Sequence, residues 1–276
     1  LFKMSIQLSV IIVNYNGMRF FFSCFNSLYD KLSTLNYEII VIDNNSTDES
    51  CAYIKANHPK VHLIESKINY GFGKGNNEAV KYAKGSTILL LNNDTILLDK
   101  IDELVMMLEK DQSIGVIGIK MLDKNKKYLH SNGNFPTFFN MLKYKNILSV
   151  NSDLLTGNFS KNKYFVDWIS GAFVLIRKNT YNEIKGFDED YFMYVEDVDF
   201  CKKIEEIGLK RMFFTNYSYI HFVGFNTSKN HLLIEGYKIY IKKHTKGIKK
   251  LILKSAIFIK WMFQKVLKPY ISKNND

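Results

Sequence analysis

Three acidic residues, Glu196, Asp197 and Asp199, follow the aromatic run at residues 191–194 and precede a segment typical of a helix. Carboxylates this close repel one another, and aromatic neighbours exclude water, so both effects raise the pKa of at least one of them. A carboxylate of this kind can accept a proton from a substrate hydroxyl. Acids are also favoured in the first turn of a helix, where they offset the helix dipole. The cluster alone does not decide between these two interpretations.

A second group of polar residues ends three apolar segments of the chain. They are Asn14 and Asn16, then Asp43, Asn44, Asn45 and Ser46, and finally Asn92, Asn93 and Asp94. Ligands of parallel α/β sheets bind beyond the carboxyl ends of the strands, which share one edge. We therefore expect these side chains to meet in one site. An acid that ends a buried strand, as Asp43 does, is costly unless it binds a partner such as a base or a ribose.

Asp94 could hold a hard divalent cation, Mg²⁺ or Mn²⁺, between two phosphates, since such cations prefer oxygen ligands. The same residues suit an Asx turn, which is the commoner use of this pattern. His221 would be a second ligand only if the fold brings it to Asp94, and otherwise it is a satisfied core histidine.

The glycine-rich stretch at residues 69–77 is predicted to be a loop that leads into a short helix ending near Lys84. Its glycines could let the backbone approach a nucleotide, with Lys74 supplying positive charge. The stretch follows the third strand and is neither G-x-G-x-x-G nor a Walker A motif, so it does not indicate a dinucleotide site. A plain loop fits equally well.

Alternating strands and helices must position these groups. We predict strands at 8–15, 37–43, 61–65, 87–91, 114–121, 164–177 and 211–215, and helices at 20–32, 46–57, 100–110 and 197–207. Residues 46–49 have the spacing of a capping box, and Gly208 suits a helix C-cap. Continuous apolar strands alternating with helices predict an α/β fold, a parallel sheet covered on both faces. Residues 122–163 form either a lid or acceptor-facing insertion, or an ordinary surface excursion.

The composition limits the class of protein. The chain has 276 residues, of which 46% are hydrophobic, so it can bury a large core. Three widely spaced cysteines favour a reducing compartment and argue against a disulfide framework. The first apolar run is only as long as a strand, and we expect no signal peptide.

The positive charge is concentrated at the C-terminal end. From residue 238 onward there are eleven lysines and one acid, which give +10 of the formal charge of +11. The rest of the chain is nearly neutral, so the sequence predicts a basic tail and no nucleic-acid-binding domain.

At helical spacing over residues 242–268, lysines 243, 246, 250, 254, 265 and 268 lie on one side, and Ile252, Ala256, Ile259, Met262, Phe263 and Val266 on the other. Lysines interrupt every stretch of about twenty residues, which argues against a membrane span. We expect a basic amphipathic helix at a membrane surface. The alternative is that the apolar side packs on the catalytic domain or on a second subunit.

Together these pieces resemble family 2 glycosyltransferases of the GT-A fold, in particular the bacterial rhamnosyltransferase-like branch. The matching stretches are 10–17, 38–48, 69–77, 88–95, 168–173 and 186–199, which occur in the family's order and lie within residues 8–225. The resemblance implies a mostly parallel GT-A domain over 1–237, with a basic amphipathic extension over 238–276.

The resemblance also implies roles for individual residues. Asp197 matches the catalytic base, with Glu196 supporting it, and Asp94 and His221 match metal ligands for Mg²⁺ or Mn²⁺. Trp168 and Gly171 belong to the acceptor side. The nucleotide-sugar site comprises Asn14, Asn16, Asp43, Asn45, Asn69, Lys74, Asn76, Asn92 and Asn93. Asn92 stands where the family's D-x-D motif has its first aspartate, so this chain has fewer charged ligands.

The implied reaction is an inverting, metal-dependent transfer from a nucleotide sugar, dTDP-rhamnose or a UDP-hexose, to a glycan or lipid-linked glycan in bacterial surface polysaccharide synthesis. The expected location is the cytoplasm, at the inner face of the cell membrane, and a homo-oligomer is left open. One rival is a sugar nucleotidyltransferase, but residues 14–19 poorly match the activating loop that it needs. The other is a non-catalytic binding protein with a basic tail, which leaves Asp43, Asp94 and Asp197 unexplained.

Overall fold

The structure is a computed structural model that describes residues 5–142, 151–222 and 230–262. The strands are β1 (Leu8–Asn14), β2 (Tyr37–Asp43), β3 (His62–Glu65), β4 (Thr87–Asn92), β5 (Thr95–Leu97), β6 (Ile114–Leu122), β7 (Tyr128–Leu129), β8 (Asn132–Gly133), β9 (Lys163–Phe165), β10 (Trp168–Ile169), β11 (Phe173–Arg177) and β12 (Lys210–His221). The helices are α1 (Met18–Lys31), α2 (Ser50–Asn57), α3 (Gly71–Val80), α4 (Asp102–Lys110), α5 (Phe138–Leu142), α6 (Ser152–Thr156), α7 (Lys178–Glu183), α8 (Glu196–Glu206), α9 (Asn230–His244) and α10 (Gly247–Met262).

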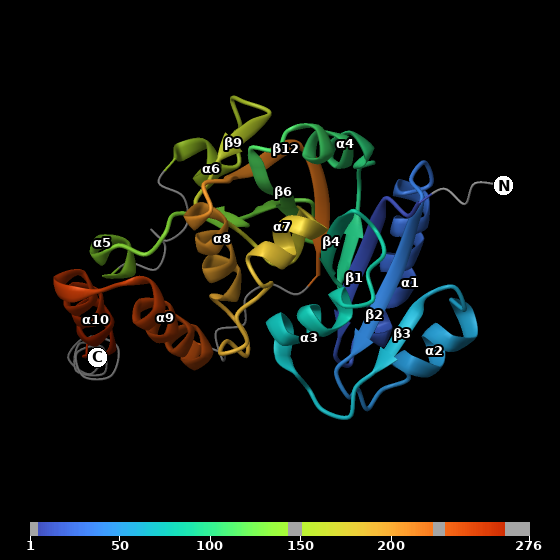
Figure 1. Ribbon diagram of the computed structural model, residues 1–276, viewed down its shortest axis with the longest axis horizontal. Coiled ribbons are helices and arrows are strands. Elements are labelled where there is room, and N and C mark those ends of the chain that lie inside the picture. Colours follow the sequence, from blue (N-terminus) through green and yellow to red (C-terminus); the bar gives the residue numbers. More distant parts are fainter. Residues whose placement is uncertain (1–4, 143–150, 223–229, 263–276) are drawn as a thin grey trace, which may run out of the picture.

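A central sheet with the order β3-β2-β1-β4-β11-β6-β12-β5 has helices on both faces (Figure 1). The strands β3, β2, β1 and β4 are parallel and match the predicted segments to within one residue. In their register Asn14 lies opposite Asp43, and Val13 lies opposite Asn92. The polar residues that end these strands therefore lie along one edge of the sheet. The predicted α/β fold is confirmed.

The other half of the sheet is mixed. Strand β11 is antiparallel to both β4 and β6, and β12 is parallel to β6 but antiparallel to β5. The single strand predicted over 164–177 is wrong, because the chain turns twice there and forms β9, β10 and β11. Phe173 pairs with Leu91, so β11 begins at the carboxyl end of β4. Residues just before β11 are thereby brought to the edge where the polar residues gather.

Each face of the sheet has its own hydrophobic core. Side chains alternate between the faces of a strand, so Val10 and Ile12 of β1 join one core and Ile11 joins the other. Helices α1, α2 and α4 cover the first core. Helices α3, α7, α8, α9 and α10 cover the second. Residues of the basic C-terminal segment, such as Tyr240 and Leu253, are therefore buried in the body of the protein.

The capping box predicted at residues 46–49 is wrong. Helix α2 begins at Ser50, and its N-cap Glu49 makes no side-chain capping bond. The hydroxyl of Ser46 instead accepts hydrogen bonds from the backbone N–H of Asn16 at 2.8 Å and from Asn14 Nδ2 at 3.1 Å. The side chain of Ser46 therefore makes tertiary contacts and does not cap the helix, although the local spacing predicts a cap.

The glycine-rich stretch is also not a loop, because most of it is helix α3. A Cβ on Gly73 would lie 3.0 Å from Phe187 Cβ, and one on Gly75 would lie 3.1 Å from Val13 Cγ1. At Gly71 a Cβ would overlap the carbonyl oxygen of Phe192. These three glycines let α3 pack closely on its neighbours, which gives them a role without a bound nucleotide.

The single helix predicted over 242–268 is broken into α9 and α10, with Gly247 at φ +54° after the break. The boundary predicted between residues 237 and 238 falls inside α9. Helix α10 packs against α5, in the segment 122–163 that the sequence left open. None of the helices in the described ranges has both the length and the hydropathy of a membrane span. Phe263, Lys265, Val266 and Lys268 lie outside the described residues.

Gly71 and Gly208 provide a matched test of this packing, because their φ angles are +77° and +79° but only Gly71 has atoms against it. Gly208→Ala should lower the free energy of unfolding by about 1–2 kcal/mol, the cost of a left-handed residue. Gly71→Ala should cost at least about 1 kcal/mol more, because it also forces atoms to overlap. Urea unfolding of both variants measures the difference. Equal losses would show that Gly71 is needed for its φ angle alone.

Candidate active site

Side-chain hydrogen bonds join the carboxyl ends of β1, β2 and β4. Asn14 Nδ2 donates to Asp43 Oδ2 at 2.6 Å, and Asn93 Nδ2 donates to Asn14 Oδ1 at 2.7 Å. Asn14 and Asp43 are buried, so these bonds give both groups the partners that burial requires. A Cβ on Gly17 would overlap this amide pair, so only glycine fits above it. Predicted residues from three strands thus meet in one network.

Asn16 and Asn45 lie in the two loops beside this network. Both adopt left-handed conformations, with φ of 52° and 64°, which asparagine tolerates better than most residues. Asn16 Oδ1 accepts a hydrogen bond from the backbone N–H of Thr47 at 2.8 Å, which ties the two loops together. Ser46, one of the polar residues that the sequence analysis placed at this edge, bonds to both Asn14 and Asn16.

The predicted donor-binding residues around α3 have partners within the chain. Asn69 Oδ1 accepts from the N–H of Gly71 at 2.8 Å, and buried Asn76 donates to the carbonyl of Phe72 at 3.0 Å. Lys74 Nζ lies 3.0 Å from Glu189 Oε2 in an exposed ion pair. These contacts stabilise the segment locally, and the donor contacts of Asn69, Lys74 and Asn76 stay predictions.

The fold brings His221, at the end of β12, to the turn after β4. His221 Nε2 lies 3.2 Å from Asp94 Oδ1 and 3.2 Å from the amide of Asn92. Asp94 is buried. Nδ1 of His221 is buried too and has no hydrogen-bond partner among the described residues. His221 therefore lies close to Asp94, which the sequence analysis required of it as a metal ligand.

These residues fit a divalent cation. Neighbouring ligands of an octahedral ion with bonds of about 2.1 Å lie about 3 Å apart, which matches the separation of Asp94 and His221. Within the described ranges no group of three His, Cys, Asp or Glu side chains could hold a metal ion. A cation here would have one carboxylate and one imidazole from the described part of the chain, and oxygens from elsewhere, such as phosphates, would have to complete the coordination.

The acids at the start of α8 differ in their surroundings. Asp197 is half-buried, and its Oδ2 accepts a hydrogen bond from the N–H of Gly171 at 3.2 Å. Burial raises the pKa of Asp197 to about 6, although backbone N–H groups oppose the shift. Burial, and then the charge of Asp197, raise the pKa of Glu196 well above its usual value. Glu196 therefore holds its proton more tightly, while Asp197 is ionised near neutral pH and partly accessible.

Asp199 is occupied by other contacts. Its Oδ1 accepts from the hydroxyl of Tyr191 at 3.1 Å and lies 2.7 Å from His244 Nε2. It is almost completely buried. Helix α8 does begin at Glu196, so the helix-start interpretation is correct for the backbone, and the proton-acceptor interpretation suits Asp197 alone. The sequence analysis missed His244, whose distance along the chain hides the contact.

Two consecutive residues connect Asp197 to the Asn92–Asp94 turn. Gly171 donates its N–H to Asp197, and the carbonyl of Ala172 accepts from the N–H of Asn92 at 3.1 Å. Burial, and then the charges of Asp94 and Asp197, raise the pKa of Tyr219. The backbone bonds show that Asp94 and Asp197 stand on adjoining elements.

The two predicted acceptor-side residues lie differently. A Cβ on Gly171 would lie 3.8 Å from Asp197 Cβ and 2.8 Å from a ring carbon of Phe72, so Gly171 is part of the wall beside the acid. Trp168 is buried in the core, and its Nε1 donates to the carbonyl of Asn134 at 3.2 Å. Any contact between acceptor and chain near Asp197 would involve Gly171 more directly than Trp168.

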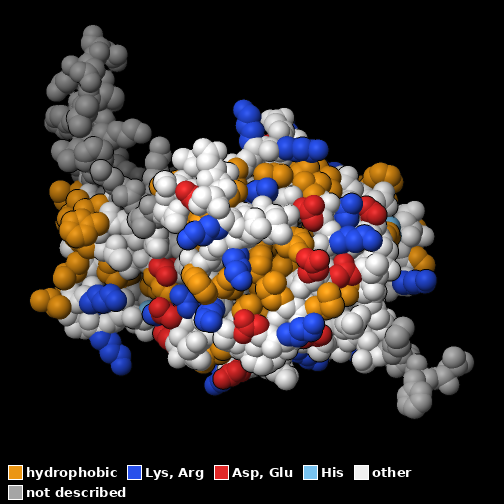
Figure 2. All heavy atoms as spheres, turned by 90° about the horizontal axis from the view of Figure 1, so that it is seen from above, with side chains coloured by type: hydrophobic (Ala, Val, Ile, Leu, Met, Phe, Trp, Pro, Cys, Tyr) orange, Lys and Arg blue, Asp and Glu red, His pale blue; other side chains and the backbone are white. Residues whose placement is uncertain are grey.

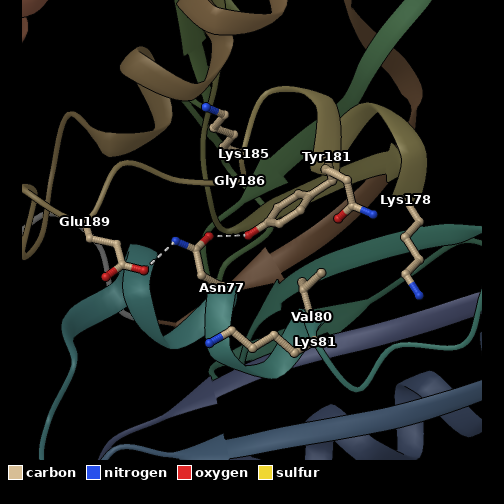
Figure 3. Close-up of a pocket in the computed structure, with 9 residues that line it drawn as sticks. Asn77, Val80, Lys81, Lys178, Tyr181, Lys185, Gly186 and Glu189 are labelled. Atoms are coloured by element: carbon tan, nitrogen blue, oxygen red, sulfur yellow. Dashed lines mark hydrogen bonds between the residues drawn. The ribbon is translucent and has the colours of Figure 1, made fainter.

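A pocket of about 480 Å³ lies away from these residues, between α3, α7 and residues 185–189 (Figure 3). Asn77 forms its inner wall, accepting from the hydroxyl of Tyr181 at 2.7 Å and donating to Glu189 at 3.3 Å. Lys178 and Lys185 at its rim point in different directions (Figure 3). None of the predicted site residues lines it.

The arrangement of the fold is shared with solved glycosyltransferases. TarS 1–349 of S. aureus superposes with a TM-score of 0.59 at 18% identity, over 95% of this chain and 73% of that one. GalNAc-T7 with UDP, GalNAc and Mn²⁺ superposes with a TM-score of 0.65 at 15% identity, over 98% of this chain and 58% of that one. At these identities the likeness shows the fold, which is GT-A.

Curated relatives are similar in sequence. The chain is 29% identical over 201 residues to the rhamnosyltransferase WbbL of Escherichia coli (strain K12), covering 68% of this chain and 73% of that protein. It is 25% identical over 199 residues to the low-salt glycan biosynthesis hexosyltransferase Agl10 of Haloferax volcanii, covering 71% and 60%. The model of the family "Glycosyl transferase family 2" matches residues 9–165, more than half of the chain. The chain therefore belongs to glycosyl transferase family 2 and is a glycosyltransferase.

Proposed function

We propose that the chain transfers a hexosyl or deoxyhexosyl group, such as rhamnose, from a nucleoside diphosphate sugar to a glycan hydroxyl, with inversion at the anomeric carbon. The observation that carries this proposal is the partly accessible carboxylate of Asp197, joined through Gly171 and Ala172 to the turn that holds Asp94. The names of WbbL and Agl10 support rhamnosyl or hexosyl transfer. TarS complexes with UDP and UDP-GlcNAc support a nucleotide-sugar donor.

Asp197 acts as the general base in the proposed reaction. Its carboxylate accepts the proton of an acceptor hydroxyl while that oxygen forms a bond to the anomeric carbon. The bond from that carbon to the phosphate oxygen breaks, and the nucleoside diphosphate leaves with the electron pair. A single displacement from the opposite face inverts the configuration. Burial and the charge of Asp197 raise the pKa of Glu196 well above its usual value, so the proposal gives the base role to Asp197 and not to Glu196.

The donor is bound at the edge formed by β1, β2 and β4 in this proposal. Asp43, Asn14 and their neighbours in the loops bind the base and the ribose. Asp94 and His221 would hold a divalent cation, which when bound would neutralise charge on the diphosphate. Since the described residues offer one carboxylate ligand, Asp94, cation binding would depend on the donor's phosphates.

Substitution of Asp197 tests the base. Asp197→Asn should lower kcat/KM by about 10²-fold or more while nucleotide binding is retained. For the parent enzyme, kcat/KM should fall about tenfold per pH unit below pH 6, because the base must be ionised and burial raises its pKa to about 6. Asp30→Asn, an exposed aspartate on α1, is the matched control. Unchanged turnover in Asp197→Asn would remove Asp197 from the mechanism.

A thermal-shift panel tests the donor and the cation. UDP, dTDP or GDP at about 100 times its Kd should stabilise the protein by about 2.7 kcal/mol, and the shift should require Mn²⁺ or Mg²⁺. Asp94→Asn and His221→Ala should remove the metal-dependent part. His62→Ala, at the opposite end of β3 from the site, should retain it. A full nucleotide shift in the presence of a chelator would contradict the cation proposal.

We further propose that α10 lies on an anionic membrane. Its outward face carries exposed apolar side chains, namely Ile248, Leu251, Ile252, Phe258, Ile259 and Met262. Leu253, Ala256 and Ile257 pack on the body from the other side. The predicted apolar side is thus split, since Ala256 is buried and Ile252 exposed. Hydrophobic side chains and lysines gather at this end of the molecule (Figure 2).

Charge selects a lipid surface over a second copy of the chain. Residues 238–262 include eight lysines and no acid, so two such faces would repel each other. Each lysine near an anionic leaflet adds about 1 kcal/mol of attraction. The same proposal places the enzyme in the cytoplasm at the inner face of a bacterial membrane, where it would act on lipid-linked glycans. Three free cysteines suit such a reducing compartment.

Vesicle flotation tests the membrane proposal. The parent protein should float with vesicles that contain phosphatidylglycerol, because both apolar insertion and charge contribute to binding. It should remain at the bottom of the gradient when the vesicles are neutral. Leu251→Glu/Phe258→Glu should lose most of the binding. Met106→Glu, at an exposed apolar position on α4, should float like the parent. Absence of flotation together with a dimer that the double variant disrupts would identify the face as a subunit interface.

A further inference from the structure

The backbone just before Asp197 is strained. Tyr194 and Val195 have φ of 71° and 72°, so two consecutive residues other than glycine are left-handed. A β-branched residue in this region is an outlier, and each such residue costs on the order of 1–3 kcal/mol. This conformation sets the direction in which α8 starts, and it persists only where surrounding contacts determine it.

Helix α3 holds this segment from one side. The N–H of Phe72 donates to the carbonyl of Phe192 at 3.1 Å, and the absence of a side chain on Gly71 leaves room for that carbonyl. The ion pair between Lys74 and Glu189 links the same helix to residues a few positions earlier.

Helix α9 holds the segment from the other side in a similar way. A Cβ on Gly236 would lie 2.6 Å from the carbonyl oxygen of Tyr194 and 2.8 Å from Val195 Cγ2, so α9 is in close contact with the strained pair. Lys243 Nζ lies 2.7 Å from Asp190 Oδ2 and also contacts Asp188. The strained segment is thus enclosed by two helices, each with a glycine and a lysine at the contact.

The last residue of α9 reaches the first turn of α8. His244 Nε2 lies 2.7 Å from Asp199 Oδ1, and Nδ1 lies 3.1 Å from Glu206 Oε1. Burial by itself would lower the pKa of His244, but the bonds and charges of Asp199 and Glu206 raise it overall. A charged imidazole can donate from both nitrogens, which joins α9 to two points on α8. Asp199 stands two residues after Asp197.

We infer that His244 is a positioning residue for the transfer reaction: by pairing with Asp199, it fixes the first turn of α8 and the strained Tyr194–Val195 segment, and so orients the Asp197 carboxylate. This inference rests on the proposed role of Asp197 as the base. In this inference Asp199 holds α9 in place, and Asp197 takes part in the reaction. The role of His244 also makes the C-terminal segment, which carries the proposed membrane face, part of the catalytic apparatus.

Kinetics of His244→Ala test the inference. Because a displacement of about 1 Å can cost up to 10²-fold in rate, kcat should fall between about 10- and 100-fold, while KM for the donor and the nucleotide thermal shift stay near the parent values. His244→Gln, which keeps one donor, should be intermediate. Added imidazole should restore part of kcat in His244→Ala. His231→Ala, an exposed histidine on the same helix, should behave like the parent.

Hydrogen exchange of residues 191–198 provides a measurement that does not require turnover. Exchange there should become faster in His244→Ala and stay unchanged in His231→Ala. Unchanged exchange or unchanged kcat in a folded His244→Ala would overturn the inference. If Asp197→Asn is inactive in that case, the proposed function stands. If the parent transfers no sugar, the proposed function and the positioning role of His244 both fail, and exchange then reports only whether α9 holds the segment.

Discussion

The hydrogen bond from the N–H of Gly171 to the Asp197 carboxylate is the contact on which the site depends. It connects α8 to the chain that runs into β11, and the next residue, Ala172, bonds to Asn92 at the end of β4. A hydrogen bond to a charged group contributes about 1.5–3 kcal/mol, yet burial still dominates and raises the pKa of Asp197 to about 6. The proposed base, Asp197, and the turn with Asp94, the proposed cation ligand, are therefore linked through two consecutive backbone groups.

The same region shows why the chain contains so many close glycine contacts. Gly71 and Gly73 on α3 and Gly236 on α9 lie against residues 187–195, so the segment before the acids is enclosed from both sides. Enclosure of this kind maintains a strained backbone. Rigid support on both sides is what a base with one productive orientation requires.

Family membership separates the classes of function that the residues left open. Because residues 9–165 match a glycosyltransferase family, the alternatives of a non-catalytic binding protein and a sugar nucleotidyltransferase are no longer needed to explain these residues. The basic C-terminal helices then need no nucleic acid to explain them. One side of α9 and α10 completes a hydrophobic core, and the outer side of α10 is apolar and flanked by lysines.

The sequence by itself determined the parallel half of the sheet and the positions of Asn14, Asp43 and Asp94 at its edge, because continuous apolar runs end in polar residues whatever surrounds them. The resemblance of the whole series of motifs also singled out Asp197 as the candidate base, which stays a prediction. The sequence could not determine that residues 164–177 form three strands, that Ser46 accepts a hydrogen bond from Asn14, or that residues 71–80 are helical. Tertiary contacts override local propensity at these places. The separate roles of Asp197 and Asp199 were likewise decided only by the tertiary structure: the two acids have equal chemistry, and burial together with His244, 45 positions from Asp199 along the chain, makes them different.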